Sequence, residues 1–327
     1  MGRRLSKCYK ASLDEDRHRV CSVPDNLQET VLREAVNVSN PESVIMPALR
    51  AAAPPNRTAD QLWEHYQIEK QLAAQLRNAS RTERRKLYSE AYDELFRRVP
   101  HHPQLARKVS SAERARNVQE QLGLLRRFLT PDSCFLEIGA GDCALSLHLA
   151  ERVHQVYALD VSETISRESR VPANFRLILS DGVSVPVPPG SVTVAYSNQL
   201  MEHLHPEDAA EQLANIVNGI ATGGVYVCVT PNLLTGPHDV SRSFDDTATG
   251  FHLKEYTNTE LRRIFRNAGF RRTVQYARLR SGYFRIPAWV TYVLERGLGA
   301  LSPSLRKRLC RNRLARSVLG IWMVGWK

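Results

Sequence analysis

The chain of 327 residues is 43% hydrophobic and 24% charged, which is typical of a globular protein. No apolar run reaches the roughly 18–20 residues that span a bilayer, and the six cysteines form neither a CxxC pair nor a metal-ligand spacing. We therefore expect buried thiols in a reducing compartment and no zinc site. The net charge of +11 is uneven, because residues 271–327 hold 13 of the 45 basic residues and one acid.

Residues 1–58 are the first segment, and their apolar residues show only weak periodicity. The segment begins with a basic and then an acidic stretch without an apolar core, which argues against a secretory signal. It ends in the breaker sequence MPALRAAAPPNRT. We expect a poorly ordered leader outside the fold, with Met46 as an alternative natural start.

Helices are predicted over residues 58–129. Capping-box sequences begin at Thr58, Ser80 and Ser110, each followed three residues later by Gln or Glu. Apolar residues then recur at helical spacing. We expect residues 59–111 to form a helical cover that precedes the main domain.

The main domain is predicted over residues 112–327, where short apolar runs alternate with amphipathic helical stretches. The predicted strands are CFLEI (134–138), VYALD (156–160), FRLILSD (175–181), VTVAYSN (192–198), VYVCVTPN (225–232) and a run at 272–280. Buried parallel strands joined by crossover helices make a doubly wound α/β domain, which is the fold class that we predict.

The C-terminal end of this domain carries the excess positive charge. The last eleven residues, SVLGIWMVGWK, are predicted to be one more core strand rather than a membrane anchor. Residues 281–316 then form a basic helical insertion before that strand. The insertion holds eight basic residues against a single acid, Glu295, with aromatic residues among them.

The stretch FLEIGAGDC (135–143) places an acid and two glycines at the exit of the first strand. A side chain at Gly139 or Gly141 would obstruct a tight turn or the close approach of a ligand. In an open α/β sheet the ligand lies beyond the carboxyl ends of the strands. With Ala144, and with Asp160 about 20 residues farther on, the turn also satisfies the loose dinucleotide fingerprint GxGxxG/A.

Three acids favour S-adenosylmethionine over a dinucleotide. Glu137 lies two residues before the first glycine, where a carboxylate would repel a pyrophosphate but suits the cationic amino-acid end of S-adenosylmethionine. Asp142 lies in the first helical turn, where a pyrophosphate would dock. Asp181, followed by Gly182, closes the third strand, where it could meet an adenine amino group.

Four motifs together resemble the class I S-adenosylmethionine-dependent methyltransferases. They are ExGxG at 137–141, Asp160 after the second strand, Asp181-Gly182 after the third, and YSNQLMEHL at 196–204. Within that family the chain is similar to the quinone-biosynthesis and small-molecule branch, of the type 11/23 kind. The resemblance covers about residues 112–280 and the final strand, and it implies a Rossmann-like, seven-stranded sheet.

The resemblance also implies which residues hold the methionine end of the cofactor. These are Glu137, Gly139 and Gly141. Cys143 departs from the family, which often has a third glycine there, although a small residue still permits the turn.

The remaining cofactor roles fall on the ends of the next strands. By resemblance, Asp160 would accept both ribose hydroxyls, and Asp181 would bind the adenine amine, with Gly182 allowing its approach. Asn198 would line the region of the methyl group. The plainer interpretation of the two aspartates is that they cap strand ends or turns.

Catalysis of methyl transfer depends mainly on positioning, but a hydroxyl nucleophile also needs a base. The candidates in MEHLHPED and GFHLKEY are Glu202, His203, His205 and His252, of which we select Glu202, His203 and His252. In related quinone-type enzymes a Glu-His pair at this place lines the active site or holds a divalent metal. It can also serve only to fix the loop after the fourth strand. We predict no metal site.

The residues after the fourth strand narrow the range of acceptors. Exocyclic base-amine methyltransferases are expected to carry (Asp/Asn)-Pro-Pro-(Tyr/Phe) there, whereas this chain has Ser-Asn-Gln-Leu at 197–200. A Pro-Cys nucleophile of the cytosine-C5 type is absent from the sequence. We therefore expect O-methylation of a small, saccharide-like or lipid-linked acceptor, with residues 233–256 as a substrate lid.

The basic insertion leaves three interpretations open. Its aromatic and leucine side chains beside Arg and Lys are typical of an interfacial helix on anionic lipid, and they favour this over a groove for RNA phosphates. The plain alternative is a solvated charged face. We expect a cytoplasmic protein, with peripheral contact at the inner membrane face left open and nucleic acid disfavoured. An NAD(P)-dependent oxidoreductase and a non-catalytic, membrane-associated module that keeps the cofactor fold are the rival functions.

Overall fold

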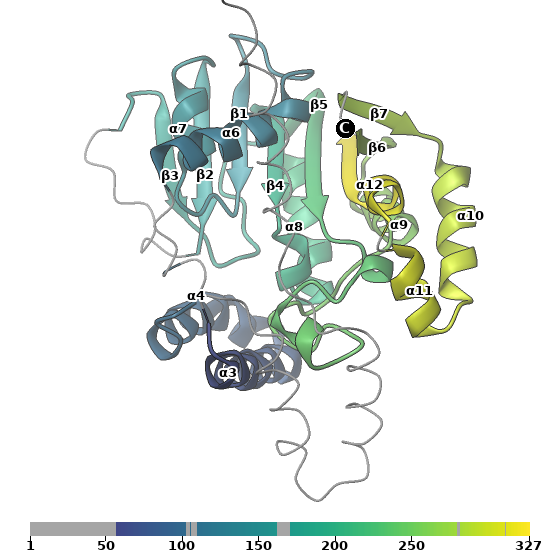
Figure 1. The fold of residues 1–327 in the computed structure, drawn as a ribbon. Coiled ribbons are helices and arrows are strands. Elements are labelled where there is room, and N and C mark those ends of the chain that lie inside the picture. The colour runs from purple at the N-terminus through teal and green to yellow at the C-terminus, as the bar shows by residue number, and fades with distance from the viewer. Residues whose placement is uncertain (1–56, 103–104, 106–109, 162–170, 280–281, 311) are drawn as a thin grey trace, which may run out of the picture. The chain divides into compact units, whose positions relative to one another are not determined.

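The computed structural model describes residues 57–327 apart from 103–104, 106–109, 162–170, 280–281 and 311 (Figure 1). The predicted leader, residues 1–58, therefore lies outside the described residues except for its last two. The chain divides into two units, residues 1–66 and 67–327. In the described part of the first unit, the amide of Gln61 donates to Thr58 Oγ1 (3.1 Å) and the amide of Thr58 donates to Gln61 Oε1 (2.9 Å), so the first predicted capping box is confirmed.

Helices and strands alternate along the second unit, as the sequence predicts. The helices are α3 (Ala59–Asn78), α4 (Arg81–Arg98), α6 (Ser111–Leu125), α7 (Ala144–Ala150), α8 (Pro206–Gly219), α9 (Asn258–Ala268), α10 (Ala288–Gly299), α11 (Pro303–Cys310) and α12 (Arg313–Leu319). The strands are β1 (Cys134–Ile138), β2 (Gln155–Asp160), β3 (Phe175–Leu179), β4 (Val192–Asn198), β5 (Ile220–Thr230), β6 (Arg272–Leu279), β7 (Gly282–Ile286) and β8 (Ile321–Trp326). Short 3-10 helices are η1 (Met201–His203), η2 (Leu233–Thr235) and η3 (Val240–Ser243).

The described strands form one sheet in the order β3-β2-β1-β4-β5-β8-β6-β7. Strands β1 to β5 pair in parallel, whereas β8 lies antiparallel between β5 and β6. The α/β fold and the final core strand are therefore confirmed. The prediction of seven strands is wrong by one: residues 282–286, which we assigned to the helical insertion, pair with β6 as an antiparallel edge strand. Their sequence GYFRI carries the aromatic and β-branched residues that suit a strand.

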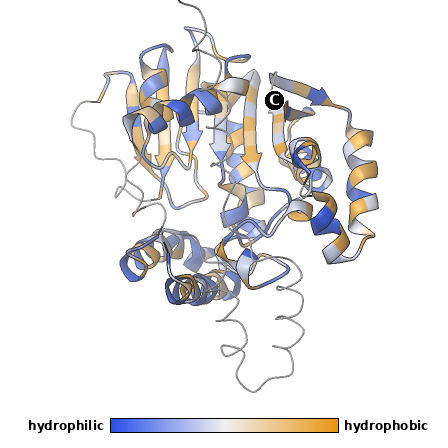
Figure 2. Cartoon of the chain, viewed as in Figure 1, coloured by the Kyte–Doolittle hydropathy of each residue, from blue (hydrophilic) through white to orange (hydrophobic). Residues whose placement is uncertain are grey.

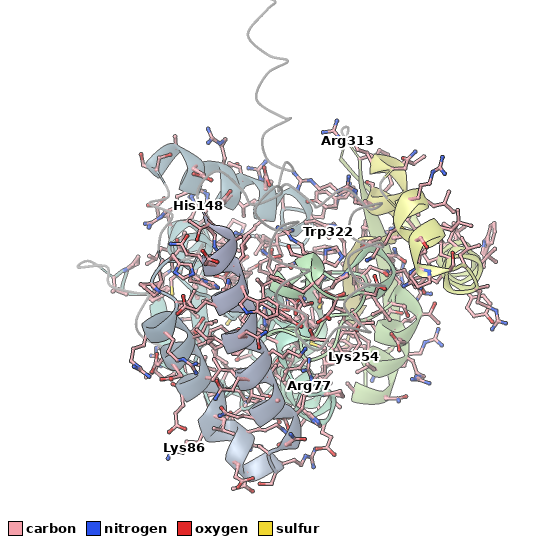
Figure 3. All side chains as sticks on the ribbon, turned by 60° about the horizontal axis from the view of Figure 1, so that its bottom comes forward. Arg77, Lys86, His148, Lys254, Arg313 and Trp322 are labelled. Atoms are coloured by element: carbon pink, nitrogen blue, oxygen red, sulfur yellow. The ribbon has the colours of Figure 1, made fainter. Side chains whose placement is uncertain are left out.

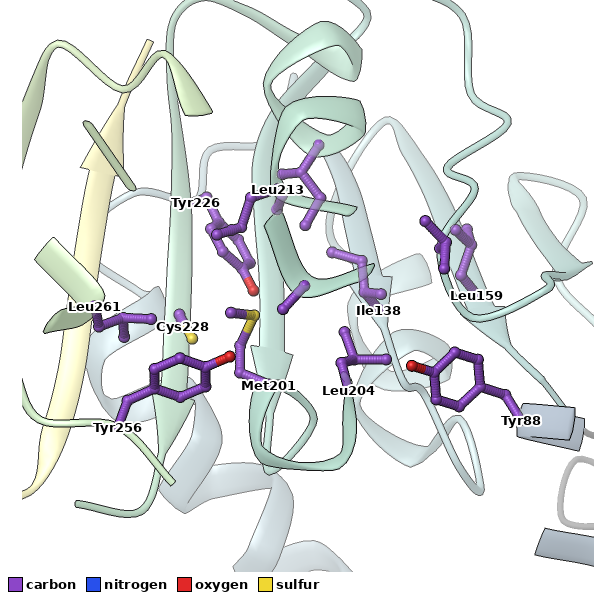
Figure 4. Packing of buried hydrophobic residues seen from close by; sticks show 14 of the residues in the cluster. Tyr88, Ile138, Leu159, Met201, Leu204, Leu213, Tyr226, Cys228, Tyr256 and Leu261 are labelled. Atoms are coloured by element: carbon purple, nitrogen blue, oxygen red, sulfur yellow. The ribbon is translucent and has the colours of Figure 1, made fainter. Parts of the chain in front are cut away.

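Side chains of β1 alternate between the two layers that cover the sheet (Figure 1). Leu136 and Ile138 belong to the core that includes residues of α8 and α9, and Figure 4 shows Ile138 in this core together with Leu213 of α8. Phe135 belongs to the other core, which includes residues of α6 and α7. Glu137 lies two residues after Phe135, so it faces the same side and meets α7.

Helix α4 is held by a buried polar cluster. Both Nε and Nη2 of Arg84 donate to the carboxylate of Asp208 in α8, at 2.5 and 2.9 Å. The hydroxyl of Tyr88 donates to Asp208 (2.7 Å) and accepts from the amide of His205 (2.9 Å). Because α8 begins just after the carboxyl end of β4, these bonds place α4 at the edge of the sheet where ligands bind. The predicted division between a cover at 59–111 and a domain at 112–327 stays a prediction.

Candidate active site

The glycine turn joins β1 to α7 and opens onto free space. Gly139 and Gly141 have φ angles of +72° and +53°, which L-residues with a side chain rarely adopt. A Cβ at Gly139 would lie 3.2 Å from the side chain of Leu200, whereas a Cβ at Gly141 would have no atom of the described residues within 4 Å beyond its chain neighbours. Gly141 therefore borders a space that a ligand could fill, and this supports the predicted cofactor cradle. Cys143, at φ +55°, takes the same left-handed conformation that a third glycine would favour.

Glu137 is buried at the start of this turn, with 5% of its surface exposed. Its Oε2 accepts a hydrogen bond from Ser146 Oγ (2.6 Å), and no described residue forms an ion pair with it. Burial raises the pKa of Glu137 to about 8. A buried carboxyl without a cationic partner suits a ligand that brings its own positive charge, as the ammonium group of S-adenosylmethionine does.

Asp160, at the end of β2, fastens the glycine turn. Its Oδ2 accepts from the amide of Gly141 (2.7 Å) and its Oδ1 from the amide of Val161 (2.8 Å). The structure thus shows the capping role, and the predicted contact with the ribose hydroxyls stays a prediction. Asn198 is the last residue of β4 and is partly exposed at the same edge of the sheet.

Asp181 is engaged by other protein groups. Its Oδ1 accepts from the amides of Val183 and Ser184, and its Oδ2 pairs with the guanidinium of Arg85 in α4. Burial alone would raise the pKa of Asp181, but these amides and Arg85 lower it to about 2. A Cβ at Gly182 would lie 2.9 Å from the ring of Tyr88. The packing of α4 therefore accounts for this glycine, and an adenine amine would have to share Asp181 with Arg85.

The predicted catalytic residues come together in one cluster. Glu202 and His203 lie in η1, and His252 lies in the loop before α9; one ligand atom from each lies within 4.8 Å of the others. The two imidazole rings are 4.9 Å apart, edge to face. Tyr92 of α4 adds a third ring, 6.2 Å from that of His203.

Each histidine of the cluster is oriented through Nδ1. Nδ1 of His203 donates to the carbonyl oxygen of Phe251 (3.0 Å), and Nδ1 of His252 donates to Glu255 Oε1 (2.8 Å). No described hydrogen bond engages Nε2 of either ring. Oε2 of Glu202 accepts from Thr230 Oγ1 (2.8 Å), whereas its Oε1 is buried without a described partner. The two Nε2 atoms are therefore available as acceptors, and Oε1 of Glu202 can accept a hydrogen bond when the carboxyl is ionised or donate one when it is protonated.

The surroundings lower the pKa of His203 and raise the pKa values of Glu202 and His252. Burial lowers the pKa of His203 to about 3, so this ring is neutral. Burial raises the pKa of Glu202 to about 7. Burial alone would lower the pKa of His252, but Glu255 and Glu202 raise it above its ordinary value. A histidine whose pKa is raised by neighbouring carboxylates, one of which also fixes its tautomer, is suited to general base catalysis.

The loop that carries His252 is fixed by residues that the sequence did not mark. Arg77, labelled in Figure 3, donates from α3 to the carbonyl oxygen of His252 (3.1 Å). The amide of His252 donates to Asp239 (3.3 Å), and the amide of Phe251 donates to Glu69 (3.1 Å). Such bonds come from helices and loops far apart in the chain, so no local spacing could have predicted them.

Two acceptor nitrogens and a carboxylate oxygen could also hold a divalent metal. Two histidines and one carboxylate are a common ligand set for catalytic zinc and for iron, and the bonds from Nδ1 to Glu255 and to the carbonyl of Phe251 are of the kind that orients metal-bound histidines. The same acceptors can instead receive the hydroxyl of a substrate. The prediction that the site holds no metal stays a prediction.

Comparison with known proteins identifies the domain. Residues 135–224 match the family model described as a methyltransferase domain. The chain contains a methyltransferase domain. Its match includes β1 to β4 and the glycine turn, and it agrees with the predicted class I S-adenosylmethionine-dependent family and with S-adenosylmethionine as the cofactor, whereas the oxidoreductase alternative receives no support.

The relatives of this methyltransferase domain are distant. Uncharacterized methyltransferases of Mycobacterium bovis and Mycobacterium tuberculosis are 28% identical over 109 residues, which is 32% of this chain and 54% of theirs. The chain thus spans about half the length of the curated relatives that it matches. Among solved structures, a SAM-dependent methyltransferase of Archaeoglobus fulgidus is 17% identical and covers 65% of this chain and 94% of that one (TM-score 0.44). Haemonchus contortus phosphoethanolamine N-methyltransferase 2 is 16% identical, with coverages of 64% and 52% (TM-score 0.44).

Proposed function

We propose that the chain transfers a methyl group from S-adenosylmethionine to a hydroxyl oxygen of a small acceptor that is saccharide-like or lipid-linked. The supporting observation is the cluster of Glu202, His203 and His252, whose ring nitrogens and carboxyl oxygen could hydrogen-bond the hydroxyl groups of an incoming acceptor molecule. The cluster adjoins the cofactor cradle, because the side chain of Leu200 packs against Gly139 and Glu202 follows two residues later. The buried hydroxyl of Tyr92 lies within electrostatic reach of both Asp160 and Glu202.

His252 is the proposed general base. Glu255 holds Nδ1–H of His252, so Nε2 can take the hydroxyl proton while Glu255 stabilises the imidazolium that forms. His203, which is neutral, would accept a hydrogen bond from a second hydroxyl of the acceptor molecule, because the reacting hydroxyl gives its only proton to His252. S-adenosylmethionine supplies, when bound, a methyl group on a sulfonium whose sulfur is a good leaving group. His252 would hold the proton that the hydroxyl oxygen gives up when it takes the methyl group.

The cofactor residues of this proposal are those predicted from the sequence. Glu137 and the turn at Gly139 and Gly141 would hold the amino-acid end, and Asp160 would hold the ribose. Asp181 and Gly182 would border the adenine, and Asn198 the methyl group. Glu137, which is protonated in the free protein near neutral pH, would lose its proton to pair with the ammonium group.

Methyl transfer from labelled S-adenosylmethionine into a fractionated extract of the source cells tests the proposal. Replacing His252 with Asn should lower incorporation by about 100-fold or more, as expected for loss of a general base, while cofactor binding by calorimetry persists. His154→Asn, at an exposed position, is the matched control and should behave as the native protein. Label in a nucleic-acid or protein fraction would contradict the acceptor class, and equal rates for the native protein and His252→Asn would contradict the base.

We also propose that the chain contacts an anionic membrane peripherally, at the inner face of a cytoplasmic location. Support comes from the excess of 13 basic residues over one acid in residues 271–327. Among the described residues, no helix has the length and hydrophobicity to cross a membrane.

A further inference from the structure

Helix α10 buries polar side chains and exposes apolar ones, which is the opposite of a typical surface helix. Its buried residues are Thr291 and Glu295, which are 0% and 7% exposed. Its large apolar residues face outward instead: Trp289 is 68% exposed, Val293 58% and Tyr292 47%. Figure 2 shows orange, hydrophobic stretches along α10. A helix that packs on a core normally buries its apolar stripe, so this outer face is suited to an apolar surrounding.

The inverted orientation is fixed by Glu295. Its carboxylate accepts hydrogen bonds from the amides of Asn258 (2.6 Å) and Thr259 (3.0 Å), the first two residues of α9. It also accepts from Thr259 Oγ1 (2.6 Å) and Asn232 Nδ2 (3.2 Å). A carboxylate at a helix N-terminus satisfies amides that have no partner within the helix. The hydrogen bonds of Glu295 therefore attach α10 to the N-terminus of α9, and they leave the apolar side of α10 exposed.

Three arginines of α9 lie beside this apolar face. Arg262, Arg263 and Arg266 line a hollow of about 580 Å³ together with Trp289 and Tyr292 of α10, and none of the lining residues is acidic. Arg262 is only 9% exposed, and its Nε has no hydrogen-bond partner among the described residues. Burial and the neighbouring Arg266 lower the pKa of Arg262, and Glu295 raises it by less, so this cation is only partly compensated. The hollow is therefore lined by arginines, and no acidic residue in its lining neutralises them.

We propose that the hollow between α9 and α10 binds the phosphate of an anionic phospholipid while the outer face of α10 enters the apolar region of the membrane. The arginines supply planar donors for a phosphate, and Trp289 and Tyr292 are residues that lie at membrane interfaces. Leu305 of α11 and Leu314 of α12 are also exposed, by 44% and 61%, and Arg313 lies at the outer edge of these helices (Figure 3). The inference rests on the membrane contact proposed above and is independent of methyl transfer.

Co-sedimentation with vesicles, without S-adenosylmethionine, tests this site. The probes are vesicles of phosphatidylcholine alone and of phosphatidylcholine with phosphatidylglycerol. The native protein should bind only the second kind. The double variant Arg263→Gln/Arg266→Gln removes two exposed charges from the hollow and should weaken that binding by about 30-fold, at roughly fivefold per charge. Arg116→Gln/Arg176→Gln removes the same charge from exposed positions elsewhere and is the matched control.

The apolar half of the site is tested by Trp289→Ser, which should weaken binding to phosphatidylglycerol vesicles while circular dichroism stays native. If both double variants weakened the binding of phosphatidylglycerol vesicles equally, the effect would be one of total charge. This would overturn the site in the hollow but not the proposed membrane contact. Absence of native binding to either vesicle would overturn the site and the membrane contact together. Thermal stabilisation by inorganic phosphate without vesicle binding would show that the hollow takes a free anion, which would overturn the lipid assignment.

Discussion

Gly141 is the residue at which binding of a cofactor can be separated from folding. Its left-handed φ of +53° makes any side chain cost about 1 kcal/mol of stability, and a Cβ there would meet no atom within 4 Å from the part of the chain that the structure describes. The same Cβ would project into the space that we assign to S-adenosylmethionine. Gly141→Ala should therefore lose little stability but bind the cofactor at least about tenfold more weakly, because the added methyl group occupies the ligand's place.

Gly190→Ala is the control for this variant, since Gly190 has a φ of +68° and equally empty surroundings. It should lose the same stability and leave the affinity measured by calorimetry unchanged. If Gly141→Ala bound S-adenosylmethionine as well as Gly190→Ala does, the cofactor would not lie against this turn.

At the scale of elements, the buried ion pair of Arg84 with Asp208 helps to hold α4 over the candidate site. Asp208→Ala would leave Nε of the buried guanidinium without its acceptor and only the half-exposed Glu207 as an ionic partner, which should cost about 3 kcal/mol of unfolding free energy in urea. Glu90→Ala, which breaks the exposed pair with Lys86 on the same helix, should change little. An equal, small effect of both variants would mean that α4 is held by its apolar contacts instead.

The sequence predicts the strands well because buried parallel strands are continuous apolar runs, which can be recognised from a few neighbouring residues. Strands β1 and β4 begin and end at the predicted residues. Strand β5 begins at Ile220, five residues before the predicted start, because its ATGG segment contains glycines that weaken the strand signal. The edge strand β7 was missed for another reason: it is short and lies in a segment whose arginines favoured a helical interpretation.

The candidate site was predicted less completely, because its partners come from distant parts of the chain. The motif residues Glu202, His203 and His252 were chosen from the sequence and lie together in the structure. The ion pair of Asp181 with Arg85 joins residues that lie 96 positions apart, and no spacing rule connects them. The same holds for the inverted face of α10, since a sequence pattern shows which residues are apolar but not which side of a helix meets the core.

For the whole molecule, the two buried carboxyls of the site make stability depend on pH. The pKa of Glu137 is raised to about 8 and that of Glu202 to about 7 by burial. In the unfolded chain both lose their protons near pH 4.5, so between that pH and about 8 the folded state binds more protons. By linkage, these groups stabilise the fold fully below about pH 4.5, and their contribution is lost as the pH rises through 7 and 8.

His203 acts in the opposite direction at lower pH. Its pKa is lowered to about 3 from an ordinary value of 6.5, so its contribution is lost as the pH falls from 6.5 towards 3. The two effects oppose each other below pH 6.5. Above it the carboxyls act together with His252, whose raised pKa makes its contribution also fall as the pH rises. The free protein should therefore lose stability between about pH 6.5 and about pH 8, by roughly 2 kcal/mol for Glu137 alone.

Urea unfolding of Glu137→Gln at these two pH values measures that contribution. Gln keeps a hydrogen bond to Ser146 but carries no proton that titrates, so the fall in stability from about pH 6.5 to about pH 8 should be smaller than in the native protein. Glu151→Gln, at an exposed position, should show the full native fall. If Glu137→Gln lost as much stability between about pH 6.5 and about pH 8 as the native protein does, the pKa of Glu137 would not be raised by burial, and the argument that its carboxyl suits a cationic ligand would fail. Saturating S-adenosylmethionine should flatten the native profile in the same way, because its ammonium group would let Glu137 ionise without loss.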